Sequence, residues 1–146
     1  MRSPSRIVAA AFFTFVCFAP AFSSAAEPST NLAEHPGIVA MNDEANRVRE
    51  VAGLKVHPTL DEDCCRIAQA HANWMAANEN MSHGGGEQII AMGYATIPDA
   101  MNAWRNSGGH WSWLGGRSEL CGYGYQRSAS GRYFWAGAFR NRKAVK

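Results

Sequence analysis

The sequence predicts an α+β fold in which helices cover a β-sheet in layers. Three segments between residues 38 and 108 repeat apolar residues at steps of three and four, which is typical of amphipathic helices. Two later segments, 120–126 and 133–139, are rich in aromatic and small residues and are typical of a β-hairpin. Because a hairpin alone cannot bury its faces, we expect the helices to pack against it.

The first 26 residues are typical of a secretory signal peptide. Two arginines, Arg2 and Arg6, precede an apolar run from Ile7 to Phe22, and small residues follow up to Ala26. The run is shorter than the roughly 20 residues that cross a bilayer. We therefore expect a periplasmic or secreted protein, which contacts a membrane only if the signal is retained.

The rest of the chain is expected to form one domain. Residues 27–37 are rich in Pro, Ser, Thr and Asn and predict a flexible lead. The predicted domain spans 38–142, a length that suits a single core, and a basic tail covers 143–146. Once Arg2 and Arg6 are removed, 12 basic residues balance 12 acidic ones, since the full chain has 14 and 12, and this balance argues against nucleic-acid binding.

Three helices are predicted before the hairpin. The first covers Ile38–Val51 and ends at Gly53. The second begins at a capping box of Thr59 and Glu62 and ends near Asn80.

The third predicted helix follows a glycine run and a short connecting segment. Gly84–Gly86 interrupts helical structure, and residues 88–94 predict an extended or mixed segment. The third helix starts around Pro98 and ends at Gly108 and Gly109. The hairpin then completes the domain.

Three cysteines remain after the signal. Export would allow a disulfide between Cys121 and either Cys64 or Cys65. Because three is odd, a free buried thiol, a bond between chains and a bridge between the two neighbours all stay open. Metal binding by the three is disfavoured, because adjacent cysteines point to different faces of a helix.

The five histidines differ in their surroundings. His35 belongs to the lead, His57 to a loop, and His71 to the apolar stripe of the second helix, where a hydrogen-bonded core histidine is expected. His83 and His110 each adjoin glycines, which let a ligand approach the backbone closely. These two are the candidate functional histidines.

Glu87 lies close to His83 in the sequence and adds a carboxylate to the candidate site. Two imidazoles can bind zinc or another divalent cation, and Glu87 could be a third ligand, an orienting partner or a general base. The separation of His83 and His110 matches no local metal motif. The alternative interpretation is that both histidines cap loops.

An ordered series of short motifs resembles the CAP superfamily, which includes cysteine-rich secretory proteins, venom allergens and pathogenesis-related plant proteins. The chain is most similar to the compact bacterial type, over roughly residues 41–140. The motifs are Asn46-x-x-Arg49-x-x-x-Gly53-Leu54, Ala68-x-x-His71-Ala72-x-x-Met75-Ala76, Ser82-His83, Gly86-Glu87, Trp104-x-x-Ser107-x-Gly109-His110 and Tyr133-Phe134-Trp135.

The resemblance implies a three-layer α-β-α sandwich with a central antiparallel sheet and a cleft where histidines and acidic residues meet. His83, Glu87 and His110 match three cleft positions. Many members carry a second glutamate where this chain has Ser107, and Gln88 and Trp111 replace the usual asparagine and arginine. This departure removes one potential ligand and one negative charge.

Three functions are compatible with these residues. The favoured hypothesis is a non-enzymatic binding module, with Ser107, Trp111 and Trp113 lining a cleft for a lipid, sterol or glycan, or with a bound cation. The second is a zinc-dependent hydrolase, in which His83 and His110 hold zinc and Glu87 activates water. The third is a structural protein that interacts with an envelope component.

Overall fold

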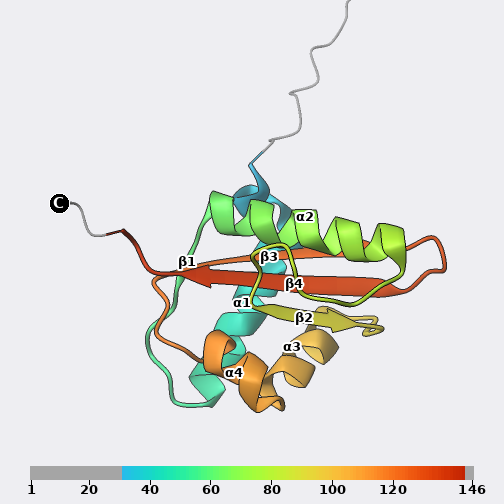
Figure 1. Ribbon diagram of the computed structural model, residues 1–146. Helices are drawn as coiled ribbons and strands as arrows, with labels where there is room; N and C mark the ends of the chain where they lie inside the picture. The colour runs from blue at the N-terminus through green and yellow to red at the C-terminus, as the bar shows by residue number, and fades with distance from the viewer. Residues whose placement is uncertain (1–30, 144–146) are drawn as a thin grey trace, which may run out of the picture.

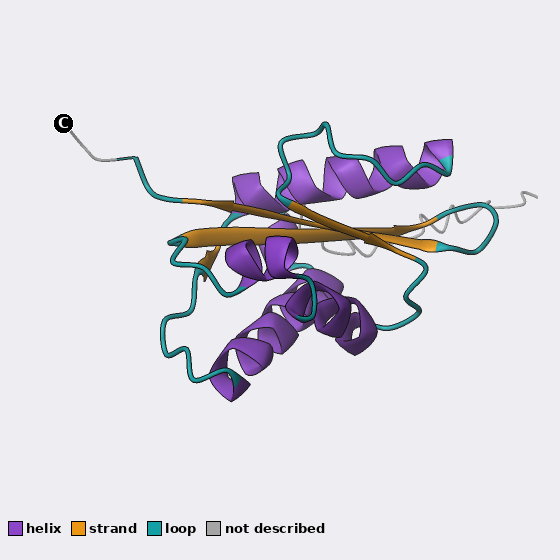
Figure 2. Cartoon of the chain, turned by 60° about the horizontal axis from the view of Figure 1, so that its bottom comes forward, coloured by secondary structure: helices purple, strands orange, loops and turns teal. Residues whose placement is uncertain are grey.

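The computed structural model describes residues 31–143, which form an α+β sandwich of three layers (Figure 1). Helix α2 covers one face of the sheet, and α1, α3 and α4 cover the other (Figure 2). This arrangement confirms the predicted fold class. The predicted signal peptide lies outside the described residues, as does most of the basic tail. The elements are η1 (Leu32–Glu34), α1 (Pro36–Val51), β1 (Thr59–Leu60), α2 (Glu62–Asn78), β2 (Ile89–Met92), α3 (Ile97–Arg105), α4 (Gly108–Leu114), β3 (Leu120–Arg127) and β4 (Tyr133–Arg140).

The sheet is mixed, which corrects the expected antiparallel sheet. Its strand order is β1-β3-β4-β2, and the predicted hairpin of β3 and β4 forms its centre. Strand β2 pairs antiparallel with β4, whereas β1 pairs parallel with β3. Parallel neighbours need a long crossover, which the chain between β1 and β3 provides with α2, β2, α3 and α4.

The start of α2 also differs from the prediction. Asp61 caps the helix, and its side chain accepts a hydrogen bond from the Cys64 N–H at 3.0 Å. Thr59 lies in β1, where its N–H donates to the Glu119 carbonyl at 2.9 Å. The predicted capping box was wrong because pairing with β3 uses the Thr59 backbone.

Helix α4 was not predicted, because Gly108 and Gly109 were interpreted as the end of the third helix. They instead begin a second short helix after α3 ends at Arg105. Leu114 is completely buried at its end, and Trp111 packs partly against the core. Burial of these side chains outweighs the low helix propensity of glycine.

Part of the predicted flexible lead is ordered in the structure. Within the described part of that segment, η1 packs Leu32 and Ala33 against the core. The Ala33 N–H donates to the Glu62 carboxylate at 3.0 Å, and α1 starts at Pro36. Long-range contacts to α2 therefore order residues whose local sequence has no helical pattern.

Alternating glycines in β3 allow α2 to lie close against the sheet. A Cβ added to Gly122 would lie 2.1 Å from the Cys65 backbone nitrogen, and one on Gly124 would lie 2.3 Å from that of Gln69. Tyr123, between them, packs into the core on the opposite face. The glycine and tyrosine alternation thus matches the two faces of one strand.

Arg49 holds α4 in place. The residue is 2% exposed. Its guanidinium donates to the carbonyl of Leu114, at the end of the helix, and to that of Gly116, just beyond it, at 3.0 Å. It also donates to the Val56 carbonyl at 2.7 Å. This contact fixes the helix whose first turn carries His110.

Candidate functional site

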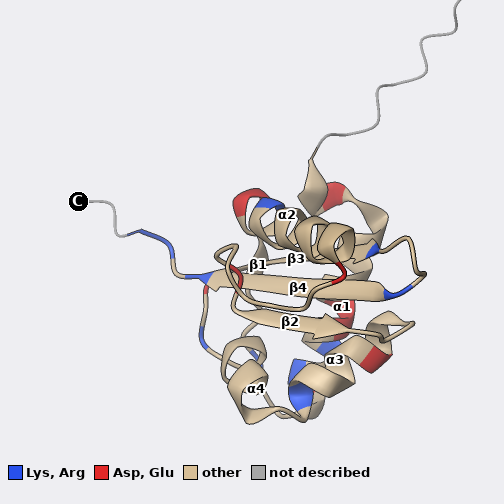
Figure 3. Cartoon of the chain, turned by 45° about the vertical axis from the view of Figure 1, so that its right-hand side comes forward, with Lys and Arg blue, Asp and Glu red and all other residues tan. Residues whose placement is uncertain are grey.

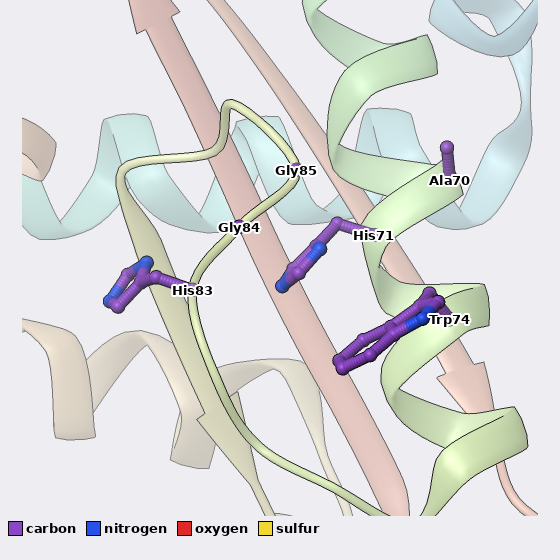
Figure 4. A pocket seen from close by; sticks show the side chains of 6 residues that line it. All are labelled: Ala70, His71, Trp74, His83, Gly84 and Gly85. Carbon is purple, nitrogen blue, oxygen red and sulfur yellow. The ribbon is translucent and has the colours of Figure 1, made fainter.

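The loop between α2 and β2 faces α2 across a hollow of about 340 Å³. Figure 4 shows His71 and Trp74 projecting from α2, and His83 projecting from the loop. The residues that line the hollow are Ala70, His71, Trp74, His83, Gly84 and Gly85.

Glu87 forms the buried base of this loop, with a side chain that is 0% exposed. Its carboxylate accepts hydrogen bonds from the Gly84 N–H at 3.2 Å, the Gly85 N–H at 2.8 Å and the His83 ring at 3.0 Å. Burial by itself raises the pKa of Glu87, but the backbone N–H donors and nearby His71 lower the pKa below its ordinary value overall. The carboxylate is therefore ionised at neutral pH.

The ionised carboxylate determines the tautomer of His83. Because it can only accept, His83 Nδ1 must carry the proton in this 3.0 Å hydrogen bond. The other ring nitrogen, Nε2, then has a lone pair, and the side chain is 54% exposed. His83 thus offers an oriented acceptor to a ligand, a proton or a metal ion.

His71 is a hydrogen-bonded core histidine, as predicted, and it also belongs to the site. Its Nε2 lies 2.6 Å from the Ser82 carbonyl oxygen, so this nitrogen carries the proton. The same atom lies 3.3 Å from the Glu87 carboxylate. His71 therefore fixes the loop from the α2 side.

Trp74 was not predicted as a site residue, and its ring stacks on His71 with ring centroids 5.6 Å apart and an interplanar angle of 14°. The spacing of three residues on one helix was the available signal, because such residues share a face. The spacing alone did not show that a loop lies opposite this face of the helix, because that loop comes from another part of the chain.

Gly85 is required for the close contact between the loop and α2. An added Cβ would lie 2.5 Å from His71 Nδ1 and 2.9 Å from a Glu87 oxygen. A Cβ on neighbouring Gly84 would meet no heavy atom within 4 Å. The two glycines therefore differ: Gly85 is packed against α2, whereas Gly84 has open space beside it.

His110 lies beside a second hollow of about 240 Å³, which is also lined by Ser107 and by residues of β2 and α3. Burial and the charge of His83 lower the pKa of His110. The structure thus brings His83 within electrostatic reach of His110. Trp111 packs against the core and Trp113 is 42% exposed, and neither lines these two hollows.

The metal-binding arrangement expected for His83, Glu87 and His110 is not formed in the described residues. Between residues 31 and 143, no group of three or more His, Cys, Asp or Glu side chains is placed to hold a metal ion. Glu87 directs both oxygens to N–H groups of its own loop. Two imidazoles are fewer protein ligands than catalytic zinc normally has.

The three cysteines are free and buried, so the structure contains none of the disulfides considered from the sequence for them. Burial raises the pKa of Cys64 to about 12, that of Cys65 to about 11 and that of Cys121 to about 12. These thiols are protonated at neutral pH and are poor nucleophiles.

Comparisons with known proteins agree with the fold. Residues 43–139 match the model of the CAP family, described as the cysteine-rich secretory protein family. A search of curated proteins found no match. Within residues 31–143, no helix is both long and apolar enough to cross a membrane.

Several solved structures share the architecture at low sequence identity. An outer surface protein from Borrelia burgdorferi has a TM-score of 0.61 and 18% identity, over 72% of this chain and 92% of its own. Venom allergen-like protein 4 from Schistosoma mansoni has a TM-score of 0.51 and 14% identity, over 76% and 96%. MpPR-1i has a TM-score of 0.52 and 14% identity, over 73% and 88%.

Proposed function

Because this chain belongs to the CAP family of cysteine-rich secretory proteins, we propose that it is an exported module that binds a small ligand beside His83 without transforming it. The observation that carries the proposal is the His83–Glu87 pair at the edge of an open hollow. A buried carboxylate that orients an exposed imidazole makes a fixed polar contact, and the adjacent indole of Trp74 adds an apolar one.

Binding without chemistry is supported by the state of the reactive groups. Glu87 is surrounded by N–H donors, which leaves it poorly placed to take a proton from water. The three buried thiols have pKa values raised to about 11 or 12. The best-placed reactive atom is His83 Nε2, which can accept a hydrogen bond from a ligand.

Export is the part of the proposal that rests on residues 1–26. Their arginines, apolar run and small residues have the pattern of a cleaved signal. Expressing the full chain in bacteria, followed by cell fractionation and N-terminal sequencing, tests this point. We expect a periplasmic or released product that begins near Glu27, and an intact cytoplasmic chain would contradict export.

The binding test measures amide and imidazole NMR shifts as fatty acids, sterols and oligosaccharides are added in separate titrations. We expect one class to shift residues 82–87, and His83→Ala to weaken that binding by about tenfold, as expected when a ligand loses a polar partner. His57→Ala is the matched control, because His57 lies in a different loop and pairs with Glu50. Saturable binding that His83→Ala does not change would contradict the proposed site.

A divalent cation is a second candidate ligand, because Nε2 of His83 has a lone pair and its side chain is exposed. Two nearby imidazoles could hold zinc or another divalent cation with water as the remaining ligands, but the engaged Glu87 gives no basis for a hydrolytic step. Zinc titration calorimetry tests this candidate. Binding that is lost in both His83→Ala and His110→Ala would support a shared cation site, whereas no heat with the wild type would exclude it.

A further inference from the structure

Trp74 lies on the outer face of α2 and is 45% exposed, beside exposed Asn73 and Ala77. Its ring stacks on His71 at 5.6 Å, and both residues line the hollow. An indole that is supported by one ring and open to solvent presents a flat apolar surface.

The support beneath this surface is rigid. His71 is 5% exposed, its Nε2–H donates to the Ser82 carbonyl at 2.6 Å, and Gly85 lies directly against its ring. A ligand that stacks on Trp74 would therefore lose little additional side-chain freedom in the protein. Such preorganisation lowers the entropic cost of binding a ligand with a flat face.

The hollow offers no carboxylate, ammonium or guanidinium group to a charged ligand. Its six lining residues include no Asp, Glu, Lys or Arg. The charged residues of α2 are Glu62, Asp63 and Arg66, all in the first turns, and the helix beyond them is uncharged (Figure 3). The Glu87 carboxylate, at the base of the loop, has no exposed side-chain surface and is already hydrogen-bonded. These features favour a neutral ligand.

The geometry also disfavours a long acyl chain. Trp74 is 45% exposed and the His83 side chain 54% exposed, so an alkyl chain between them would stay partly in water. A pyranose ring suits these walls better, because it has an apolar face of C–H groups and an edge of hydroxyls. The face can stack on Trp74 while the hydroxyl edge stays in contact with water.

We propose that Trp74, supported by His71, is a stacking subsite for a neutral sugar ring, so that the ligand of this site is an oligosaccharide. The inference rests on the proposed function, since it names the ligand class for the hollow beside His83. It adds Trp74, a residue that the His83–Glu87 pair does not require.

The test titrates the protein with the neutral trisaccharide tri-N-acetylchitotriose and, separately, with the anionic trisaccharide trigalacturonate. NMR signals of the Trp74 indole N–H and of the Gly84 and Gly85 amides report on the hollow. We expect the neutral sugar to shift these signals saturably. Trigalacturonate is expected to bind at least about tenfold more weakly, because no Lys or Arg side chain lines the hollow to pair with its carboxylates.

Substitutions at Trp74 separate stacking from incidental contact. Trp74→Ala should weaken binding of the neutral sugar by about tenfold or more, and Trp74→Phe should restore part of it, because an aromatic face remains. Trp74 is exposed, so both variants are expected to keep the wild-type melting temperature within a few degrees. Equal binding by wild type and Trp74→Ala would overturn the proposal.

Two other probes distinguish failure of this inference from failure of the proposed function. If myristate or choline shifts residues 82–87 and the sugars do not, the site binds ligands but the sugar assignment is wrong. If none of these probes, nor zinc, perturbs the hollow at millimolar concentration, both proposals fail. Sugar binding that depends on Trp113 instead of Trp74 would overturn the subsite while preserving a sugar-binding protein.

Discussion

Glu87 stays ionised without contact to solvent because the N–H groups of Gly84, Gly85 and His83 donate to its oxygens. This single side chain orients the exposed imidazole and closes the loop against α2. At the residue scale, the site therefore depends on hydrogen-bond donors that the backbone supplies. Two predictions test that dependence.

The first concerns the different roles of two adjacent glycines. Gly85→Ala should lower the free energy of unfolding by about 1–3 kcal/mol, because its Cβ would collide with His71 and Glu87. Gly84→Ala, where a Cβ meets nothing within 4 Å, should change it by less than about 0.5 kcal/mol. Urea unfolding of both variants checks this, and equal effects would contradict the described loop.

The second prediction concerns acid sensitivity. The pKa of Glu87 is lowered from 4.5 in the folded protein, so the unfolded chain binds its proton first as the pH falls. The stability that this carboxylate contributes is present above the unfolded pKa and is lost as the pH falls through the folded one.

Glu87→Gln isolates that contribution. The variant should be less stable than wild type near pH 7, and the difference should shrink as the pH falls below about 4.5. Urea unfolding over this pH range measures it. A difference independent of pH would show that the carboxylate charge contributes nothing to stability.

At the element scale, the start of α2 shows how strand pairing overrides a local signal. Thr59 and Glu62 have capping-box spacing, yet Asp61 caps the helix and Thr59 pairs with β3. In the same way, Gly108 and Gly109 begin α4, although locally they indicate a helix end. A local signal for a helix start or end therefore holds only where no distant segment pairs or packs with the same residues.

The cap assignment gives the third prediction. Asp61→Ala should destabilise the protein by about 1 kcal/mol or more, because it removes the bond to the Cys64 N–H and the ion pair with Arg140. Thr59→Ala should cost less, since its N–H pairing with Glu119 involves only the backbone. Thermal unfolding of both variants measures the two losses of stability. A larger loss for Thr59→Ala would support the capping box instead of the Asp61 cap.

The whole molecule is stabilised by cores on both faces of the sheet, without a bond between its described cysteines. The α2 side buries Ala68, Met75 and Phe134, and the other side buries Met41 and Trp104, among others. Cys64 belongs to the first core, whereas Cys65 and Cys121 belong to the second. In this structure the thiols act as small apolar side chains.

The fourth prediction follows from that role. The melting temperature of the folded domain should be the same with and without a reductant, and iodoacetamide should modify Cys64, Cys65 and Cys121 only after unfolding. The physical reason is that all three are buried, with pKa values raised to about 11 or 12. A melting temperature that falls on reduction would reveal a disulfide after export.

The fold class could be predicted from the sequence alone, because helical periodicity and the alternation of glycine and tyrosine in β3 are properties of single segments. The sequence also indicated His83, Glu87 and His110, since glycines and ordered motifs surround them. Three features could not be predicted: the parallel pairing of β1, the place of His71 and Trp74 in the site, and the hydrogen bonds of Glu87 within its own loop. Those features depend on contacts between α2, the loop and the strands, and residues that meet only through such long-range contacts leave no periodic signal in the chain.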